Sequence, residues 1–394
     1  MQRTIYAFLL SLVVCAAAVA QQGDAGQRPR NIILIGWDGA QRNHVKECLK
    51  QGELPTVKTL ASQGAMVQID VYGVTDTKAG WTEILTGYGP KVTGVYSNGR
   101  YRDVPAGLSV FERLKEHFGS DKFVCAAVIG KKGHCGEINA PFKKKLEAGA
   151  AAGEKPAQAK AAANVGNKRA AAVGRIVEEN GVKYRVFDGS PYYTMHKSCD
   201  VWEYGLELDE KVGTKAIEMI EKYKDKPFFF FVHFAEVDHK GHAHGENSKE
   251  YNDALISNDK WTGKIIAKLK ELGLYDKTLV YVTADHGFDE GGRSHKMAPF
   301  VFLASNDKGV CRDGRRDDIT PTILARFGLD LGKFAPALDG RPLTQKDDRP
   351  NPANPPGPPP GAKKQQPQAK AAKVARVARA AKAAKPVAAL PAAP

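Results

Sequence analysis

Carboxylates and imidazoles gather at three points of the chain, each at the end of an apolar run. The run ILIGWDG contains Asp38, PFFFFVHFAEVD ends at Asp238, and TLVYVTADHG contains Asp285 and His286. Because the carboxyl ends of parallel strands lie along one edge of a sheet, these side chains can converge there. Carboxylate oxygens together with imidazoles suit Zn²⁺ or Mn²⁺. The pattern therefore favours metal-assisted chemistry, although a solvated polar loop or a helix-capping Asp would explain each segment taken alone.

The segment VDHKGHAHG adds a candidate metal-ligand pair. Asp238 and His242 stand four residues apart, a spacing that brings both onto one side of a turn, and Gly241 lets the backbone pass close to an ion. His295 follows a glycine-rich turn after ADHG and supplies another imidazole. A metal site would use these residues together.

A candidate nucleophile lies in VTDTKAGWTEILTG. Thr77 stands at a turn before a predicted helix, where backbone N–H groups favour anions. A metal ion nearby would lower the pKa of its hydroxyl and activate it for attack. Asn98, in SNGRY, can donate its amide to a developing oxyanion. The alternatives are a simple helix cap for Thr77 and an ordinary turn residue for Asn98.

Apolar runs alternate with helical patterns over residues 31–345. Unbroken apolar runs such as FVCAAVIG and PFVFLAS indicate buried strands, and VKECLKQG and LPTVKTLASQG indicate helices between them. This alternation predicts one α/β catalytic domain with a mostly parallel sheet covered by helices on both faces.

The remaining segments have different compositions. Residues 1–20 combine Arg3, an apolar stretch and an A-x-A cleavage site, which predicts a secretory signal peptide and an exported chain, periplasmic or extracellular. Residues 21–30 are expected to form a linker, and 143–172, rich in Ala, Lys and Gly, a flexible insertion. No transmembrane helix is predicted in the mature chain.

Residues 346–394 are Pro-rich and then basic, which predicts a disordered tail. Its lysines and arginines can bind an anionic polymer or envelope surface by counterion release, or serve only to keep the chain soluble. No aromatic residue lies among them, so specific nucleic-acid recognition is not expected. The net charge is +14, but residues 351–394 of this tail hold eight basic residues and no acid, and the signal peptide holds one more basic residue, which leaves +5 for the rest of the mature chain.

Cysteine indicates little about the chemistry. Six are present, and loss of the signal peptide leaves five, an odd number without C-x-x-C spacing. A zinc–thiolate site is therefore not indicated. Disulfides are possible in an oxidising compartment, with Cys125 and Cys135 the closest pair in sequence.

The order of these residues resembles the alkaline phosphatase superfamily, which includes nucleotide pyrophosphatases/phosphodiesterases, phosphatases, cofactor-independent phosphoglycerate mutases, phosphopentomutases and sulfatases. The D-x-x-G-H-x-x-G and A-D-H-G motifs carry the resemblance over residues 31 to about 343, and the segment DDITPTILARFGLDLGKFAPALDGRPL is similar to the end of sulfatase-like members. The resemblance implies a three-layer alkaline-phosphatase-like sandwich.

The resemblance also implies two divalent metal ions, with Zn²⁺ favoured and Mn²⁺ possible. One ion would be held by Asp238, His242 and His295, and the other by Asp38, Thr77, Asp285 and His286. Thr77 would attack phosphorus and form a phospho-threonine that water hydrolyses. Asn98 would contact a phosphoryl oxygen. Lys131 and Lys132 fall near the position of a phosphate-binding lysine in some secreted phosphomonoesterases, or are solvated surface.

Two departures limit the choice of substrate. Sulfatases carry a modified Cys or Ser in C/S-x-P-x-R, where this chain has Thr77 followed by KAGW, and phosphodiesterases usually have Phe-Pro-Asn after their Thr. We therefore predict an exported phosphomonoesterase or phosphodiesterase acting on a small phosphate ester. A sulfatase-like hydrolase and a non-catalytic envelope- or polyanion-binding protein are the alternatives.

Overall fold

A computed structural model of the chain describes residues 28–146, 175–298 and 300–347. The predicted signal peptide, most of the linker before residue 31, residues 147–172 of the predicted insertion and the tail from residue 348 lie outside the described residues. The first residues of that insertion, Lys143 to Lys145, belong to a strand.

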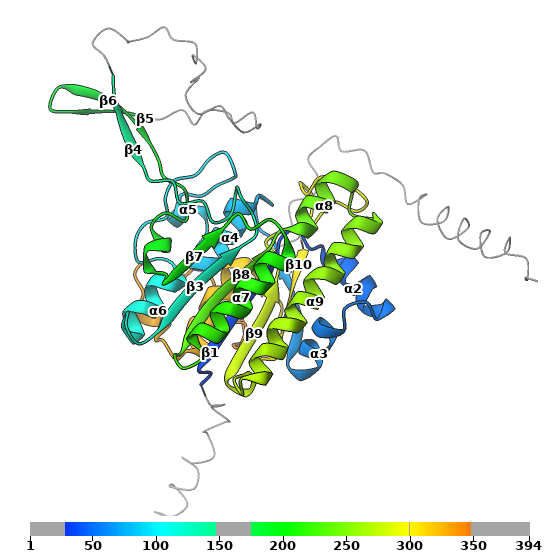
Figure 1. The fold of residues 1–394 in the computed structure, drawn as a ribbon. Coiled ribbons are helices and arrows are strands. Elements are labelled where there is room, and N and C mark those ends of the chain that lie inside the picture. Colours follow the sequence, from blue (N-terminus) through cyan, green and yellow to red (C-terminus); the bar gives the residue numbers. More distant parts are fainter. Residues whose placement is uncertain (1–27, 147–174, 299, 348–394) are drawn as a thin grey trace, which may run out of the picture. The chain divides into compact units, whose positions relative to one another are not determined.

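An eight-stranded sheet forms the centre of the domain (Figure 1). All neighbouring strands pair in parallel except β10, which runs antiparallel to both β2 and β9. The sheet is therefore mixed and mostly parallel, as predicted. In spatial order its strands are β11 (Gly314–Arg315), β2 (Ala65–Asp70), β10 (Phe300–Ser305), β9 (Thr278–Thr283), β1 (Asn31–Trp37), β8 (Phe228–Phe234), β3 (Val124–Ile129) and β7 (Val201–Tyr204).

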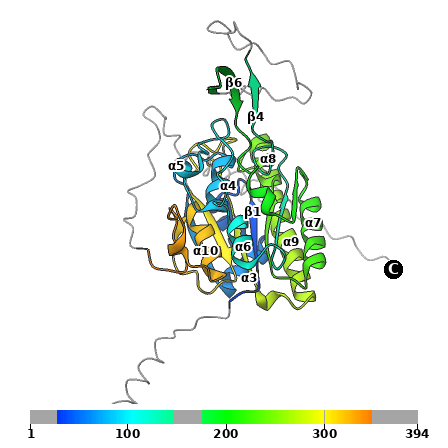
Figure 2. The same cartoon turned by 90° about the vertical axis from the view of Figure 1, so that its left-hand side faces the viewer.

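Helices cover both faces of this sheet (Figure 2). Two long helices, α7 (Asp209–Tyr223) and α9 (Lys249–Glu271), pack against each other on one face, and α9 also contacts α3 (Pro55–Gln63). The other face carries α4 (Thr77–Thr86), α6 (Val110–Phe118) and α10 (Ile319–Arg326). The three layers are those of an alkaline-phosphatase-like α/β fold.

Shorter elements complete the domain. A separate antiparallel sheet has β6 (Val182–Phe187) between β4 (Phe142–Lys145) and β5 (Arg175–Glu179), and the residues of these two outer strands are mostly exposed. No helix among the described residues is both long and apolar enough to cross a membrane. The remaining helices are α2 (Arg42–Gln51), α5 (Pro90–Thr93) and α8 (Glu236–His244). Four 3₁₀ turns are described as well: η1 (Met195–Ser198), η2 (Tyr275–Lys277), η3 (Arg316–Asp318) and η4 (Leu331–Lys333).

The inner strands are apolar along their whole length because both of their faces are covered. Every residue of β1, β3 and β8 is buried. The five cysteines of the described residues are all free thiols, so Cys125 and Cys135 do not form a disulfide.

Close packing between β1 and α4 requires a glycine at position 36. A Cβ atom there would lie 2.3 Å from the ring of Trp81, which is fully buried. We expect Gly36→Ala to lower the free energy of unfolding by about 1–3 kcal/mol, because the ring and α4 must shift. Urea unfolding measures this loss. Gly99→Ala is the control, since its Cβ would meet no atom within 4 Å; equal stability of the two variants would contradict the packing argument.

Candidate active site

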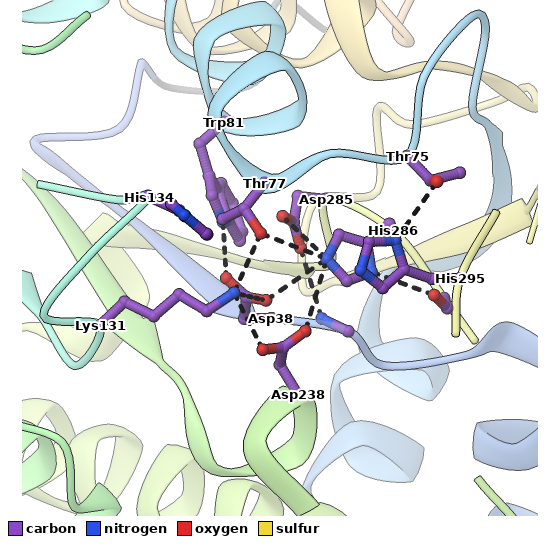
Figure 3. A network of polar contacts seen from close by, with 12 residues as sticks. Asp38, Thr75, Thr77, Trp81, Lys131, His134, Asp238, Asp285, His286 and His295 are labelled. Atoms are coloured by element: carbon purple, nitrogen blue, oxygen red, sulfur yellow. Dashed lines mark hydrogen bonds and ion pairs between the residues drawn. The ribbon is translucent and has the colours of Figure 1, made fainter. Parts of the chain in front are cut away.

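Most of the predicted site residues converge at the carboxyl edge of the central sheet, among them Asp38, Thr77, Lys131, Asp238, Asp285, His286 and His295 (Figure 3). Asp38 directly follows β1, Asp238 lies in α8 after β8, and Asp285 follows β9. These three strands are neighbours in the order β9–β1–β8, so their carboxyl ends bring the acids together. Thr77, the first residue of α4, faces them.

Asp38 is held by two residues that the sequence motifs did not indicate. Its Oδ2 accepts hydrogen bonds from His233 Nε2 at 2.8 Å and from Trp81 Nε1 at 3.1 Å. His233 is a fully buried polar residue within the apolar strand β8, and that contrast is the signal by which it could have been found. Burial lowers the pKa of His233, so its ring is neutral and donates from Nε2. Both donors bind Oδ2, which leaves Oδ1 facing the site.

Lys131 places a buried ammonium group at the centre of the site. Its Nζ lies 2.8 Å from Asp38 Oδ1, 3.0 Å from Asp238 Oδ2 and 2.9 Å from Thr77 Oγ1. Burial acts to lower the pKa of Lys131, but Asp238 and Asp38 outweigh it and raise that pKa. Lys131 is therefore protonated at neutral pH and donates to the threonine hydroxyl. Lys132, in contrast, is exposed and has no contact of this kind.

Thr77 is buried at the start of α4, with Oγ1 also 3.4 Å from His286 Nε2. Asn98 borders this turn, since its backbone N–H donates to Asp76 Oδ2 at 2.7 Å and its Oδ1 accepts from the Lys78 N–H at 2.9 Å. The Lys78 side chain is buried and forms an ion pair with Glu137. Of the three lysines near this turn, Lys131 contacts the Thr77 hydroxyl.

Two groups of side chains have a geometry suited to metal ions. In each group, the candidate ligand atoms all lie within 4.8 Å of one another. The first group, Asp238, His242 and His295, is the set expected from the sequence. The second is Asp38, Asp238 and His286, so Asp238 borders both groups. Asp285 is near the second group, with Oδ2 3.6 Å from His286 Nε2.

The charges of these residues fit divalent cations. Asp38, Asp238 and Asp285 are almost completely buried, and Lys131 supplies a single positive charge. The Oδ1 of Asp238 and the Oδ2 of Asp285 are buried without a hydrogen-bond donor. Burial and the neighbouring Asp38 raise the pKa of Asp285 well above its usual value. Buried carboxylates with unsatisfied oxygens need further positive charge, which divalent metal ions supply.

Backbone carbonyls orient two of the histidines. His242 Nδ1 lies 2.9 Å from the carbonyl oxygen of Arg293, and His286 Nδ1 lies 3.0 Å from that of Gly287. A carbonyl oxygen accepts only, so Nδ1 carries a proton in both rings and Nε2 is the nitrogen that can bind a metal ion. The Nε2 of His242 lies 3.4 Å from Asp238, and the Nε2 of His286 lies 3.6 Å from Asp38. This is the arrangement by which proteins fix metal-binding imidazoles.

The loop that carries His295 is tied to α2 and to the end of α8 by Glu246. Glu246 Oε2 accepts from the Gly291 N–H at 2.8 Å, and its Oε1 lies 2.6 Å from His44 Nδ1. The other ring nitrogen of His44 lies 3.2 Å from Asn252 Oδ1. The Glu246–His44 pair therefore links the loop to the helical layer.

The pair between His44 and Glu246 makes stability depend on pH. Burial acts to lower the pKa of His44, but its contacts with Cys48 and Glu246 outweigh this and raise the pKa from 6.5 to about 10. A group whose pKa is raised on folding stabilises fully below its unfolded pKa and loses that effect as the pH rises through the folded value. We therefore expect the free energy of unfolding to fall between pH 6.5 and about 10.

The comparison for this prediction is His44→Gln, whose stability should change less over the same range. Urea unfolding at several pH values measures the slope for both chains. His117→Gln removes an exposed histidine and is the matched control. A His44→Gln slope as steep as that of the unaltered chain would show that other groups cause the pH dependence.

Comparison with known proteins agrees with this geometry. Residues 32–315 match the model of the type I phosphodiesterase / nucleotide pyrophosphatase family. The chain belongs to this family. The family lies within the alkaline phosphatase superfamily.

Curated relatives of this phosphodiesterase-family chain match shorter segments. The phosphoglycerate mutase (2,3-bisphosphoglycerate-independent) of Wolbachia pipientis wMel is 30% identical over 142 residues, 34% of this chain and 27% of the relative. The steryl-sulfatase of Rattus norvegicus is 33% identical over 113 residues, 27% of this chain and 19% of the relative. The chain thus spans between about a fifth and a quarter of the length of these relatives.

Two solved structures resemble this chain over most of its length, at low sequence identity. A 2-O GAG sulfatase has a TM-score of 0.49 at 12% identity, covering 82% of this chain and 76% of that one. The lipoteichoic acid synthase LtaP of Listeria monocytogenes has a TM-score of 0.47 at 14% identity, covering 81% and 76%.

Proposed function

We propose that the chain hydrolyses phosphoric esters, with Thr77 as the nucleophile. The observation that supports this is the position of the Thr77 hydroxyl, which is buried at the start of α4 between Lys131 Nζ at 2.9 Å and His286 Nε2 at 3.4 Å. A hydroxyl placed among a cation, imidazoles and carboxylates has the surroundings that activate a nucleophile. A helix cap would need none of these neighbours.

The reaction has two displacement steps. In the first, Thr77 Oγ loses its proton and bonds to phosphorus, while the ester P–O bond breaks and the alcohol leaves with a proton. In the second, a water oxygen bonds to phosphorus, the Thr77 O–P bond breaks, and Thr77 regains a proton. The Lys131 ammonium donates to Thr77 Oγ1, so it stabilises negative charge on that oxygen in both steps.

The substrate phosphoryl group would lie against the start of α4. Backbone N–H groups there favour an anion. The Asn98 Oδ1 already accepts from the Lys78 N–H, which leaves the Asn98 amide NH₂ to donate to a phosphoryl oxygen. Lys132 is exposed, so we assign it no contact with the phosphoryl group.

Two divalent metal ions complete the proposed site. Asp238, His242 and His295 would hold one, and Asp38, Thr77, Asp285 and His286 the other, with Asp238 close to both. Zn²⁺ suits these oxygen and nitrogen ligands, and Mn²⁺ is the second candidate. When bound, such ions lower the pKa of the attacking hydroxyl and stabilise charge on the attacking and leaving oxygens.

The proposal also includes export and binding to an anionic surface, which depend on the two ends of the chain and not on the site. Residues 1–20 have the composition of a signal peptide, which supports a periplasmic or extracellular enzyme. The basic residues beyond 346 support contact with an anionic polymer or envelope surface.

A substrate comparison tests the reaction class. We expect kcat/KM for p-nitrophenyl phosphate or bis-p-nitrophenyl phosphate to exceed that for p-nitrophenyl sulfate by at least about 10²-fold, because Thr77 lacks the aldehyde of a sulfatase nucleophile. The ratio of the first two values assigns the enzyme to monoesters or diesters. A dominant sulfate activity would favour the sulfatase alternative, and absence of all three activities would favour a binding protein.

A further inference from the structure

A buried arginine outside the proposed metal and phosphoryl contacts connects three segments of the site. Arg316, in η3, is 1% exposed. Its Nη1 donates to the backbone carbonyl of Asp285 at 2.9 Å, and its Nη2 donates to the carbonyls of Tyr72 and Val74, each at 3.1 Å. Its Nε and Nη2 contact Glu83 Oε2 at 2.8 and 2.7 Å.

Each of these partners belongs to a segment that carries a site residue. Asp285 precedes His286 at the end of β9. Tyr72 and Val74 lie in the turn that leads to Thr77, and Glu83 lies on α4, which begins at Thr77. A single planar guanidinium therefore ties the β9 end, the nucleophile turn and the nucleophile helix to one another.

Helix α4 packs closely against Asp285 and Arg316 at Gly80. A Cβ atom at Gly80 would lie 2.8 Å from Asp285 Cβ and 3.0 Å from Arg316 Nη1. The helix thus passes directly over the Asp285 backbone and the guanidinium. A movement of Arg316 would change the distance between α4 and the end of β9.

We propose that Arg316 is a positioning residue that sets the Thr77 hydroxyl against Asp285 and His286 by holding α4 and the β9 end together. Glu83 acts with it, because its carboxylate fixes the guanidinium on α4. The inference rests on the proposed function, in which Thr77 is the nucleophile. Arg316 itself has no contact with Thr77, so its effect is on geometry.

A cavity beside this arginine allows a chemical-rescue experiment. The cavity has a volume of about 360 Å³ and is lined by Arg316 together with Glu83, Tyr72 and Val74. In Arg316→Ala, guanidinium ion from solution has a space to enter and a carboxylate to bind there.

The experiment measures kcat, KM and metal content of the full chain with p-nitrophenyl phosphate or the diester, at a temperature where each variant is folded. We expect Arg316→Ala to lower kcat by about 10²-fold with a smaller change in KM, because small displacements of a nucleophile have effects of this size. Guanidinium ion at a non-denaturing concentration should raise the kcat of Arg316→Ala at least about tenfold. Arg316→Lys should remain impaired, since one ammonium cannot reach all of these acceptors.

Two further variants separate positioning from stability. Arg113→Ala removes another buried arginine. Its guanidinium donates to Tyr88 Oη at 2.6 Å, beyond the end of α4 opposite to Thr77, so the variant should lower stability with kcat unchanged. Glu83→Gln should lower kcat, and adding it to Arg316→Ala should have little further effect, because the two residues form one unit.

The outcomes are distinct. A folded Arg316→Ala chain with unchanged kcat overturns the inference, as does a loss that guanidinium does not restore. If Arg316→Ala does not fold, Glu83→Gln decides: a lower kcat supports positioning, and an unchanged kcat overturns it. Retained activity in Thr77→Val would instead remove the proposed function itself.

Discussion

Thr77→Val is expected to lower kcat for phosphoric esters by at least about 10³-fold while the chain remains folded. Valine has nearly the shape of threonine but lacks the oxygen that would bond to phosphorus. The hydroxyl accepts from Lys131 and lies near His286, so its loss removes the group on which the proposed chemistry depends. Steady-state kinetics measure kcat, and the amount of phosphoryl group trapped on the protein after acid quenching should fall to background.

Thr82→Val is the matched control for this substitution. Thr82 lies on the same helix, is equally buried, and its Oγ1 has no hydrogen-bond partner. We expect Thr82→Val to retain kcat and to be at least as stable as the unaltered chain, because no hydrogen bond is lost. If Thr77→Val and Thr82→Val had the same kcat, the Thr77 hydroxyl would have no part in the reaction.

Removal of divalent metal is the second change with a large expected effect. Dialysis against a chelator should reduce turnover to background, and Zn²⁺ or Mn²⁺ should restore it, because the buried carboxylates need positive charge in order to hold the site together. Added metal should also raise the Tm, since an ion that binds only the folded state stabilises it. Activity that survives complete removal of metal would exclude the two-metal proposal.

Asp238→Asn tests the same proposal at a single residue. Asp238 borders both candidate metal groups, so the variant should lose bound metal by mass spectrometry and nearly all turnover. Asp259→Asn is the matched control: Asp259 is also buried, but it accepts from the Thr56 and Val57 N–H groups at the start of α3. We expect it to lower stability and to leave the metal content unchanged.

Stability measured in chelator and with added metal gives a second test of Asp238 as a metal ligand. In chelator, Asp238→Asn should be less stable than the unaltered chain, because the buried ammonium of Lys131 loses one of its carboxylate partners. Added metal should widen the difference in stability between the unaltered chain and Asp238→Asn, since the unaltered chain binds the ion more tightly. A normal metal content in Asp238→Asn would contradict the assigned ligands.

Much of the fold follows from local pattern. The apolar runs that form β1, β3, β8 and β9 predict buried strands because parallel sheets are covered on both faces. The acids at their ends predict a site along one edge for the same reason, and the structure brings Asp38, Asp238 and Asp285 to that edge. The reversed direction of β10 was not predictable, because an apolar run is the same in either direction.

Local sequence pattern indicates which residues could do chemistry, since a buried strand followed by a carboxylate or imidazole is a local feature. The packing of the folded domain establishes which of these residues contact one another. Lys131 and Lys132 are adjacent in sequence, yet neighbouring side chains diverge, and only Lys131 lies among the carboxylates. His233 and Arg316 are far along the chain from Asp38 and Thr77, so no spacing rule links them. Their contacts exist because the sheet and helix layers bring distant segments together.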